Sequence, residues 1–330
     1  MDVSTYLAMP IVETTQVGEA RRRATRLAES RGFGETAVGQ IAIAATELGN
    51  NLVKHTHAGG TLFVQVGFEG CIELICVNRG GGTNNTSVWM RDGFSTAGTM
   101  GTGLGAVSRL AQEFDIYSDV EHGTTVVARF YEKPVESLFD VGIIAVPKEN
   151  EPVCGDTCAV VEEGRRISAM VADGLGHGIE AAEASREAAR LFRQIPFGEP
   201  AEILRVMHGE LRKTRGAAVS ILQIEPHHRK ARFSGVGNVS ALVADSENRR
   251  HFVPDNGTVG YELRKVRNTE IEWSPTDIVV MHSDGFSASW NLDEYPLLTR
   301  HLASTIAATL FRDFSKRHDD ATVIVIKARH

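Results

Sequence analysis

Four aspartates in the second half of the chain stand in segments that suit a single site for divalent metal ions. Three of the four follow or adjoin short apolar runs of β type, which predicts an acid at each strand end. The four are Asp156, Asp173, Asp284 and Asp319. Oxygen ligands without paired Cys or His at ligand spacing favour Mg²⁺ or Mn²⁺ over Zn²⁺. Two such ions about 4 Å apart would activate a bridging water and neutralise phosphoryl oxygens, so the pattern predicts a metal site that removes phosphate.

Asp173 is the expected bridge between two ions. It precedes the tight turn Gly174-Leu175-Gly176, where glycine lets backbone carbonyls approach a second ion. The helix expected after Gly178 could direct its N-terminal amides at a phosphate. His177 has two open interpretations: it protonates the leaving group, or it caps that helix.

The first half of the chain carries residues typical of a nucleotide site. Glu47 and Asn51 are four residues apart on one predicted helix and share a face, with Lys54 one turn further on. An acid, an Mg²⁺-binding amide and a phosphate-facing lysine are what phosphoryl transfer needs. The run Gly101-Thr102-Gly103-Leu104-Gly105 then opens a helix, where bare backbone amides can hold phosphates. The glycine run is weak evidence alone and gains weight only in this combination.

Hydrophobic periodicity predicts two α+β domains that meet near Lys133-Pro134, at residues 1–133 and 134–330. A length of 330 residues allows two ordinary cores. In the first domain we expect helices at 17–31, 35–56 and 106–113 and strands at 61–68, 71–78, 114–118 and 124–131. In the second we expect helices at 178–193, 200–212 and 295–313 among antiparallel strands at 141–146, 157–162, 166–172, 217–225, 230–236, 240–244, 278–283 and 321–327.

Composition excludes several classes of protein. A net charge of -7 argues against nucleic acid as a partner. No apolar stretch approaches the ~20 residues of a membrane helix, and the N-terminus lacks the pattern of a secretion signal. Four cysteines without a disulfide framework predict reduced thiols in a cytoplasmic protein. The sequence does not indicate an oligomeric state.

Six segments of the second domain together resemble the SpoIIE/RsbX branch of PPM-type Ser/Thr phosphatases, in order and spacing. They are Gly155-Asp156, Ala172 to Gly178, Arg215 to Leu222, Val236 to Val239, His282 to Gly285 and Asp319 to Thr322. The resemblance covers about residues 134–330 and implies an α-β-β-α sandwich. It implies that Asp173 bridges both metals, that Asp156 and the Gly174 carbonyl serve one, and that Asp284 and Asp319 serve the other. Asp320 occupies a neighbouring position that is not usually a ligand, and we interpret Asn238 as structural.

The first domain, over about residues 8–131, resembles the GHKL (Bergerat) ATPase α/β sandwich, and specifically the RsbT-like serine kinases. The similar segments are Arg91 to Gly105 and Gly123 to Val126. The resemblance implies that Asn51 binds the Mg²⁺ of Mg·ATP and that Glu47 acts as base or water-orienting acid. It places Gly101, Gly103 and Gly105 at the phosphates.

One position departs from that family. Asn78 stands where the family has an aspartate that accepts a hydrogen bond from the adenine amino group. The amide still offers a carbonyl oxygen, but losing the charge-assisted bond costs about 1–2 kcal/mol, which is about tenfold or more in ATP affinity. The amide could also flip to donate, so the preferred base stays open.

Three functions remain in view. The first is a bifunctional regulator of a bacterial stress or sigma-factor partner switch. By resemblance, its substrate is a small STAS-domain protein, which one domain phosphorylates and the other dephosphorylates. The second is a phosphatase whose first domain only senses nucleotide or docks a partner. The third is a scaffold with both sites degenerate, which the intact set of acids opposes.

Overall fold

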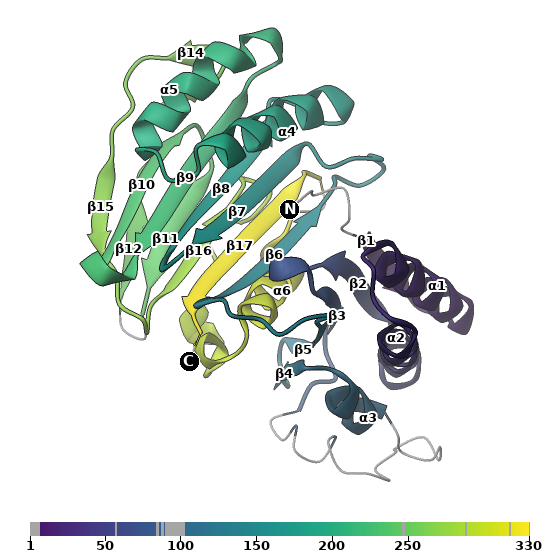
Figure 1. The fold of residues 1–330 in the computed structure, drawn as a ribbon. Helices are drawn as coiled ribbons and strands as arrows, with labels where there is room; N and C mark the ends of the chain where they lie inside the picture. The colour runs from purple at the N-terminus through teal and green to yellow at the C-terminus, as the bar shows by residue number, and fades with distance from the viewer. Residues whose placement is uncertain are drawn as a thin grey trace. The chain divides into compact units, whose positions relative to one another are not determined.

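The computed structural model describes residues 7–56, 58–83, 86, 89, 103–245, 248–287, 289–316 and 318–329. The chain divides into two compact units, drawn in Figure 1. The N-terminal unit contains Thr5–Glu136 together with Asn291–Asp313, and the C-terminal unit contains Ser137–Trp290 and Phe314–His330. The N-terminal unit thus includes a segment, Asn291–Asp313, that lies far along the chain from the rest of it.

The N-terminal unit is built on an antiparallel five-stranded sheet. Its strands, in spatial order, are β1 (Leu7–Ile11), β2 (Gly60–Val66), β3 (Ile72–Asn78), β5 (Gly123–Phe130) and β4 (Glu113–Asp119). Helices α1 (Thr14–Ser30) and α2 (Glu35–His55) pack against each other and the sheet, and α3 (Gly103–Leu110) contacts α2. The apolar positions of α2 that set its predicted period, including Ile41, Ala45 and Leu48, are buried. Strand β1 was not predicted; it lies at the sheet edge, where Pro10 is tolerated.

A row of polar side chains crosses one face of this sheet. Gln65 lies directly opposite Glu73, and Glu73 lies opposite Arg129, so all three point to the same side. Arg129 donates from Nε to Glu73 Oε1 at 2.7 Å and from Nη2 to Ser304 Oγ at 2.6 Å. Ser304 belongs to helix α6 (Ala303–Phe314), most of which lies in the segment Asn291–Asp313 and which packs on this face. These groups are almost fully buried, so α6 completes a buried ionic network in the N-terminal unit.

Arg129→Ala is expected to destabilise the N-terminal unit by about 3–5 kcal/mol, because it leaves the buried Glu73 carboxylate without its counter-charge. Thermal unfolding of the full chain, with hydrogen exchange to locate the loss of protection in β3 and β5, measures the effect. Arg23→Ala is the matched control. Arg23 pairs with Glu19 on the exposed side of α1, where solvent screens the charges, so its loss should change the stability little. Equal effects of the two variants would contradict the role given to the network.

The helix predicted over 295–313 begins later than expected. Two short 3₁₀ turns, Leu292–Glu294 and Leu298–Arg300, precede α6 at Ala303. Pro296 cannot donate a backbone hydrogen bond, and Leu297 adopts a left-handed conformation with φ of 62°. Both features interrupt a helix that periodicity alone would extend to Tyr295.

The C-terminal unit contains two antiparallel five-stranded sheets. The first has the order β15 (Thr269–Glu272), β10 (Lys230–Val236), β9 (Ala217–Glu225), β8 (Arg166–Gly174), β7 (Asp156–Glu163). The second has the order β12 (Arg249–Phe252), β11 (Ser240–Ala244), β16 (Ile278–His282), β17 (Ala321–Ala328), β6 (Phe139–Val146). A small ribbon joins β13 (Gly257–Thr258) and β14 (Glu262–Leu263). The short strands β12 to β15 were not predicted.

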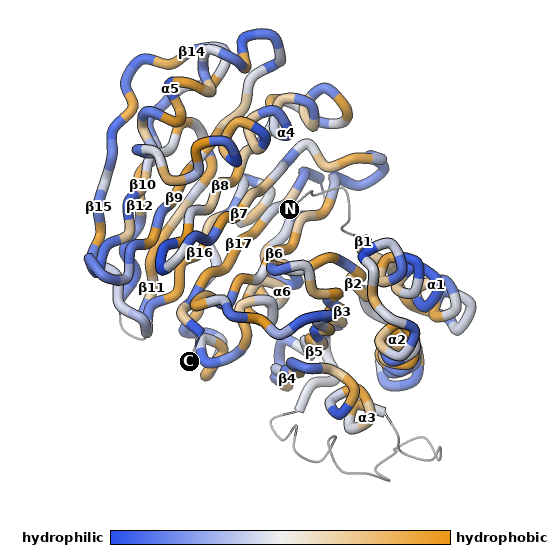
Figure 2. The backbone as a smooth tube through the Cα atoms, viewed as in Figure 1, coloured by the Kyte–Doolittle hydropathy of each residue, from blue (hydrophilic) through white to orange (hydrophobic). Residues whose placement is uncertain are grey.

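Helices α4 (Ile179–Gln194) and α5 (Pro200–Glu210) cover the first of these sheets (Figure 1). Figure 2 shows apolar and hydrophilic residues alternating along α4, as expected of a helix with one buried face. Ala184, Ala188 and Phe192 of that face pack with Met170 and Ala172 of β8 in one apolar cluster. This packing fixes the loop between β8 and α4, which carries the Asp173 segment.

Two general predictions can be compared with the structure directly. No helix in the described ranges combines the length and the apolar character needed to cross a bilayer. The four cysteines all carry free thiols, as expected.

Candidate metal centre and nucleotide site

Asp156 and Asp173 face each other across two neighbouring strands. Asp156 is the first residue of β7, and its register partner on β8 is Asp173. The turn after Asp173 is close-packed: a β-carbon on Gly174 would collide with the backbone of Ala181 on α4. Only glycine fits there.

Asp284 and Asp319 lie at the corresponding ends of two strands of the second sheet. Asp284 follows β16 and Asp319 precedes β17, and these two strands are paired. Two hydrogen bonds of Ser283 join the two strand ends. Its N–H donates to the Thr322 carbonyl at 3.0 Å, and its Oγ accepts from the Thr322 N–H at 3.0 Å. The sequence order therefore brings two acids to this end of the second sheet.

The acids of both sheets act on one another electrostatically. Burial, followed by the charges of Asp284, Asp319 and Asp320, raises the pKa of Asp173 to about 7. Burial and the Asp319 carboxylate also raise the pKa of Asp284. Burial, followed by the charge of Asp173, raises the pKa of Asp156 well above its usual value. The structure thus joins the four sequence-predicted acids, with Asp320 added, into one cluster of mutually repelling carboxylates.

Unpaired buried oxygens indicate that this cluster fits a cation. Asp156 is only 1 % exposed, yet neither of its carboxylate oxygens has a hydrogen-bond partner. The hydroxyls of Ser283 and Thr322 are near enough to favour its ionised form but do not complete hydrogen bonds. Asp320 is also buried; its Oδ1 accepts the Lys148 N–H at 2.9 Å, while Oδ2 has no partner. A buried carboxylate without hydrogen bonds is costly unless a positive ion pairs with it.

The structure brings the acids together at strand ends, but their side chains do not form a complete coordination shell. Among the described residues, no three His, Cys, Asp or Glu side chains already converge on one point at ligand distance. The oxygen donors that the structure brings together are carboxylates, which suit Mg²⁺ or Mn²⁺. The residues present therefore fit hard divalent ions in type and charge.

Asn238 belongs to the site, although we interpreted it from the sequence as structural. Its Nδ2 donates to Asp284 Oδ2 at 2.6 Å, and a hydrogen bond from the same side chain lowers the pKa of Asp173. Gly237, with φ of 99°, turns the chain so that Asn238 lies between the two acids. The signal was present in Val236-Gly237-Asn238-Val239, but nothing in the sequence gives the partner of the amide.

Asn238→Ala is expected to lower metal-dependent hydrolysis by about 10–100-fold, because residues that orient metal ligands commonly have effects of that size. Activity measured as a function of Mn²⁺ concentration should show that part of the loss is weaker metal affinity. Asn248→Ala, at an exposed position between β11 and β12, serves as the control. Wild-type activity in both variants would remove Asn238 from the site.

Two further side chains belong to segments next to the acids. His177, in the loop after Asp173, pairs through Nδ1 with Glu151 Oε1 at 2.6 Å and is largely exposed, and the N-cap of α4 is Gly178 and not His177. Lys316 donates from Nζ to the backbone oxygen of Asp284 at 2.6 Å, and its charge lowers the pKa of Asp284. Lys316 was not predicted; it places a cation at the edge of the acid cluster.

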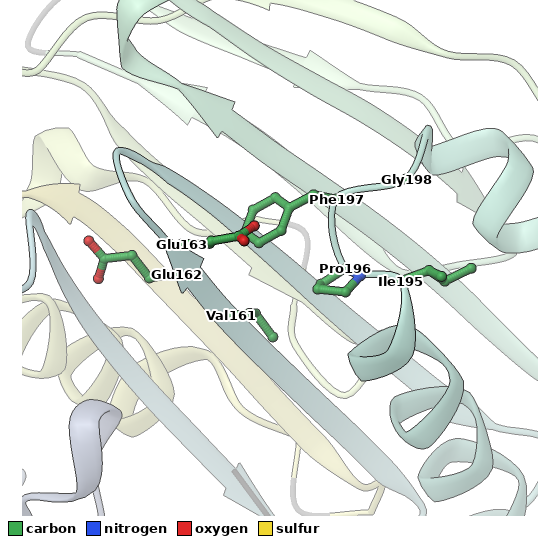
Figure 3. A pocket seen from close by; sticks show the side chains of 7 residues that line it. All are labelled: Val161, Glu162, Glu163, Ile195, Pro196, Phe197 and Gly198. Atoms are coloured by element: carbon green, nitrogen blue, oxygen red, sulfur yellow. The ribbon is translucent and has the colours of Figure 1, made fainter.

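A surface hollow in the same unit is separate from this chemistry. Its lining includes Val161, Ile195 and Phe197, which Figure 3 shows around the hollow. It lies where β7 ends, whereas Asp156 begins that strand, roughly 23 Å away at 3.3 Å per residue. The hollow therefore contributes nothing to the metal site.

In the N-terminal unit, the structure brings together two of the predicted nucleotide residues. A β-carbon added to Gly103, at the start of α3, would lie 3.7 Å from Asn51 Oδ1 on α2. The Asn51 Nδ2 is buried and has no hydrogen-bond partner. Glu47 lies one turn earlier on α2, Lys54 is exposed near its end, and Gly105 is buried within α3. Gly101 lies outside the described residues.

Asn78, the residue that differs from the family pattern, is the last residue of β3. Its Nδ2 donates to the Gly80 carbonyl at 2.9 Å. The amide nitrogen is thus engaged with its own loop, and the carbonyl oxygen is left as the group that could face a ligand. This orientation favours acceptance over donation at Asn78.

The two halves of the chain match two family models. The model described as Stage II sporulation protein E (SpoIIE) matches residues 163–329, about half of the chain. The model of the histidine kinase-like ATPase domain matches residues 12–130. The first range contains Asp173, Asp284 and Asp319 and begins after Asp156, and the second contains the nucleotide residues.

Individual relatives divide the chain in the same way. The phosphoserine phosphatase RsbX of Bacillus subtilis (strain 168) is 24% identical over 184 residues, 54% of this chain and 89% of its own. The serine/threonine-protein kinase RsbT of the same organism is 33% identical over 111 residues, 33% of this chain and 84% of its own. A solved structure from work on the bacterial stressosome, described as a modular system adapted to control secondary messenger signalling, is 27% identical with a TM-score of 0.55. It covers 58% of this chain and 100% of that chain.

Proposed function

The chain belongs to the SpoIIE family, and from that premise we propose that it switches the phosphorylation state of a partner protein in both directions. It combines a Ser/Thr phosphatase domain with an RsbT-like kinase domain. The C-terminal unit removes phosphate from a serine or threonine, and the N-terminal unit phosphorylates the same partner with Mg·ATP. The observation that carries the phosphatase half is the buried, unpaired Asp156 carboxylate in register with Asp173.

In the phosphatase site, Asp156, Asp173, Asp284 and Asp319 would hold Mg²⁺ or Mn²⁺, with Asp173 shared and the Gly174 carbonyl as a further ligand. Bound ions of this kind supply an activated water and neutralise phosphoryl oxygens. The side chain of Asn238 orients the Asp284 carboxylate. The first amides of α4 are available to hold phosphate oxygens.

In the kinase site, Asn51 would bind the Mg²⁺ of Mg·ATP and Glu47 would orient or deprotonate the acceptor hydroxyl. The amides at the start of α3, from Gly103, would hold the phosphates. The unpartnered Asn51 amide beside Gly103 supports this assignment.

The proposed partner is a STAS-domain protein in a bacterial partner-switching pathway. The support is that the chain joins relatives of a phosphoserine phosphatase and a serine/threonine kinase of one organism, and that it is similar to a solved structure from the stressosome. Opposed activities in one chain serve a purpose only if a signal or the nucleotide level favours one at a time.

A second candidate is a phosphatase whose N-terminal unit only senses nucleotide or docks the partner. Asn78 favours this candidate, because an amide replaces the charged acceptor of the family and its nitrogen already donates to the Gly80 carbonyl.

Calorimetric titration of Mg·ATP into the full chain, wild type beside Asn78→Asp, distinguishes the two candidates. Micromolar binding by the wild type, with about tenfold tighter binding in Asn78→Asp, is the outcome expected of the kinase–phosphatase switch. Binding only in Asn78→Asp would instead support the phosphatase with a docking domain. Phosphoryl transfer to a STAS-domain protein, followed by mass spectrometry, then tests the kinase step itself.

A further inference from the structure

Two exposed apolar side chains follow the Asp173 ligand directly along the chain. Leu175 is 54 % exposed and Ile179, the first residue of α4, is 63 % exposed. The acid cluster accounts for Asp173 and for the glycine after it. It gives no reason for solvent-exposed apolar side chains next to them. Single exposed apolar residues are common on protein surfaces, so their neighbours decide whether they form a patch.

A third exposed side chain comes from a neighbouring loop. The Leu175 N–H donates to the Gly216 carbonyl at 3.0 Å. On the other side of Gly216, an added β-carbon would lie 3.6 Å from the backbone nitrogen of Tyr261, whose side chain is 80 % exposed. Val259 and Ala217 exchange backbone hydrogen bonds of 2.8 and 2.9 Å, which fixes these two loops against each other. The backbones of Leu175 and Tyr261 thus both lie next to Gly216.

Arg215 connects the parts of this surface. A β-carbon on Gly176 would lie 3.1 Å from its Nη1, and its Nη2 pairs with Glu180, the residue after Ile179. Both partners are more than half exposed, so solvent screens the ion pair, and it contributes little beyond holding the loop beside Glu180. We call Leu175, Ile179 and Tyr261, arranged around Arg215, the apolar rim.

The position of the apolar rim relates it to the substrate. A phosphoserine can place its phosphate at the acid cluster only if its own backbone lies over the edge of the site. Adjacent residues follow at about 3.5 Å of chain per residue, so their side chains reach the loop that begins at Gly174. Leu175 is two residues from Asp173, so this end of the rim adjoins the acid cluster along the chain.

Resting on the proposed phosphatase function, we propose that the apolar rim docks the segment around the phosphorylated residue, and that it selects substrates with apolar side chains next to the phosphoserine or phosphothreonine. Burying one Leu or Ile side chain contributes enough for about a tenfold preference. The polar reaction at the metals does not depend on these contacts, so small phosphoesters do not sense them.

The test uses the full chain with Mn²⁺ and three probes: p-nitrophenyl phosphate, a phosphoserine peptide with glycine on both sides, and the same peptide with leucine on both sides. We expect the wild type to hydrolyse the leucine peptide with a kcat/KM about tenfold or more above the glycine peptide. The double variant Leu175→Ala/Tyr261→Ala should bring the two peptides within about twofold while its hydrolysis of p-nitrophenyl phosphate stays at the wild-type rate.

Ile195→Ala is the matched control. Ile195 is a 41 % exposed isoleucine at the far end of α4, about 24 Å from Ile179 along the helix axis, beside the hollow in Figure 3. It should keep the preference for the leucine peptide. Equal hydrolysis of both peptides by the wild type would overturn docking at the rim and leave the phosphatase function intact. Hydrolysis of p-nitrophenyl phosphate without hydrolysis of either peptide would overturn the proposed function, and the rim with it.

Discussion

Asp173→Asn is expected to abolish dephosphorylation, with a loss on the order of a thousandfold or more in kcat/KM. The substitution removes the charge that two metal ions would share, and metal ions supply several kcal/mol of transition-state stabilisation, each 1.36 kcal/mol being a tenfold change in rate. Hydrolysis of p-nitrophenyl phosphate and of a phosphoserine peptide by the full chain measures the effect. Glu183→Gln, at an exposed position on α4, should retain full activity.

The same variant should remain folded. The pKa of Asp173 is about 7 in the folded protein and 3.8 ordinarily, so the folded state holds this proton more tightly than the unfolded state does. Ionisation of Asp173 therefore works against folding increasingly as the pH rises from about 4 through 7. Asparagine carries no charge, so at pH 8 without divalent ions Asp173→Asn should unfold at the same temperature as the wild type or higher. Retention of most activity in a folded Asp173→Asn would contradict the metal assignment.

Asn51→Ala is expected to eliminate Mg²⁺-dependent nucleotide binding by the full chain. The reason is local: the Asn51 amide is buried without a partner and lies next to the start of α3, where the phosphates would sit. Calorimetric titration of Mg·ATP, with EDTA as a second condition, provides the measurement.

The neighbouring residue offers the control for that experiment. Asn50→Ala changes the same side chain one position earlier, about 100° around α2, and should bind Mg·ATP as the wild type does. If Asn51→Ala and wild type had equal affinity, the nucleotide site would lie elsewhere on the unit.

Periodicity and strand-end acids were sufficient to predict much of both units. The apolar spacing of α2 predicted its buried face, and short apolar runs predicted the strands that carry Asp156, Asp173 and Asp284. These signals are local, because the side chains that make them belong to one element. Local signals also produced the error over 295–313, where Pro296 and Leu297 interrupt the pattern.

What the sequence could not give was which distant residues meet. Asn238 lies within a recognised motif, but its bond to Asp284 depends on how β10, β11 and β16 are connected. The row of Gln65, Glu73 and Arg129 depends on strand register, since a shift of one residue would reverse its face. The docking of α6 in the N-terminal unit joins residues far apart in the chain, through Ser304 and Arg129.

The most direct test of the central claim is hydrolysis of a phosphoserine peptide by the full chain as Mn²⁺ or Mg²⁺ is added to metal-free protein. The account predicts no hydrolysis in EDTA, a saturable rise with added metal, and no rise in Asp173→Asn. Failure of the wild type to hydrolyse the peptide or p-nitrophenyl phosphate at any metal concentration would contradict it, and would leave a scaffold with two degenerate sites as the better description.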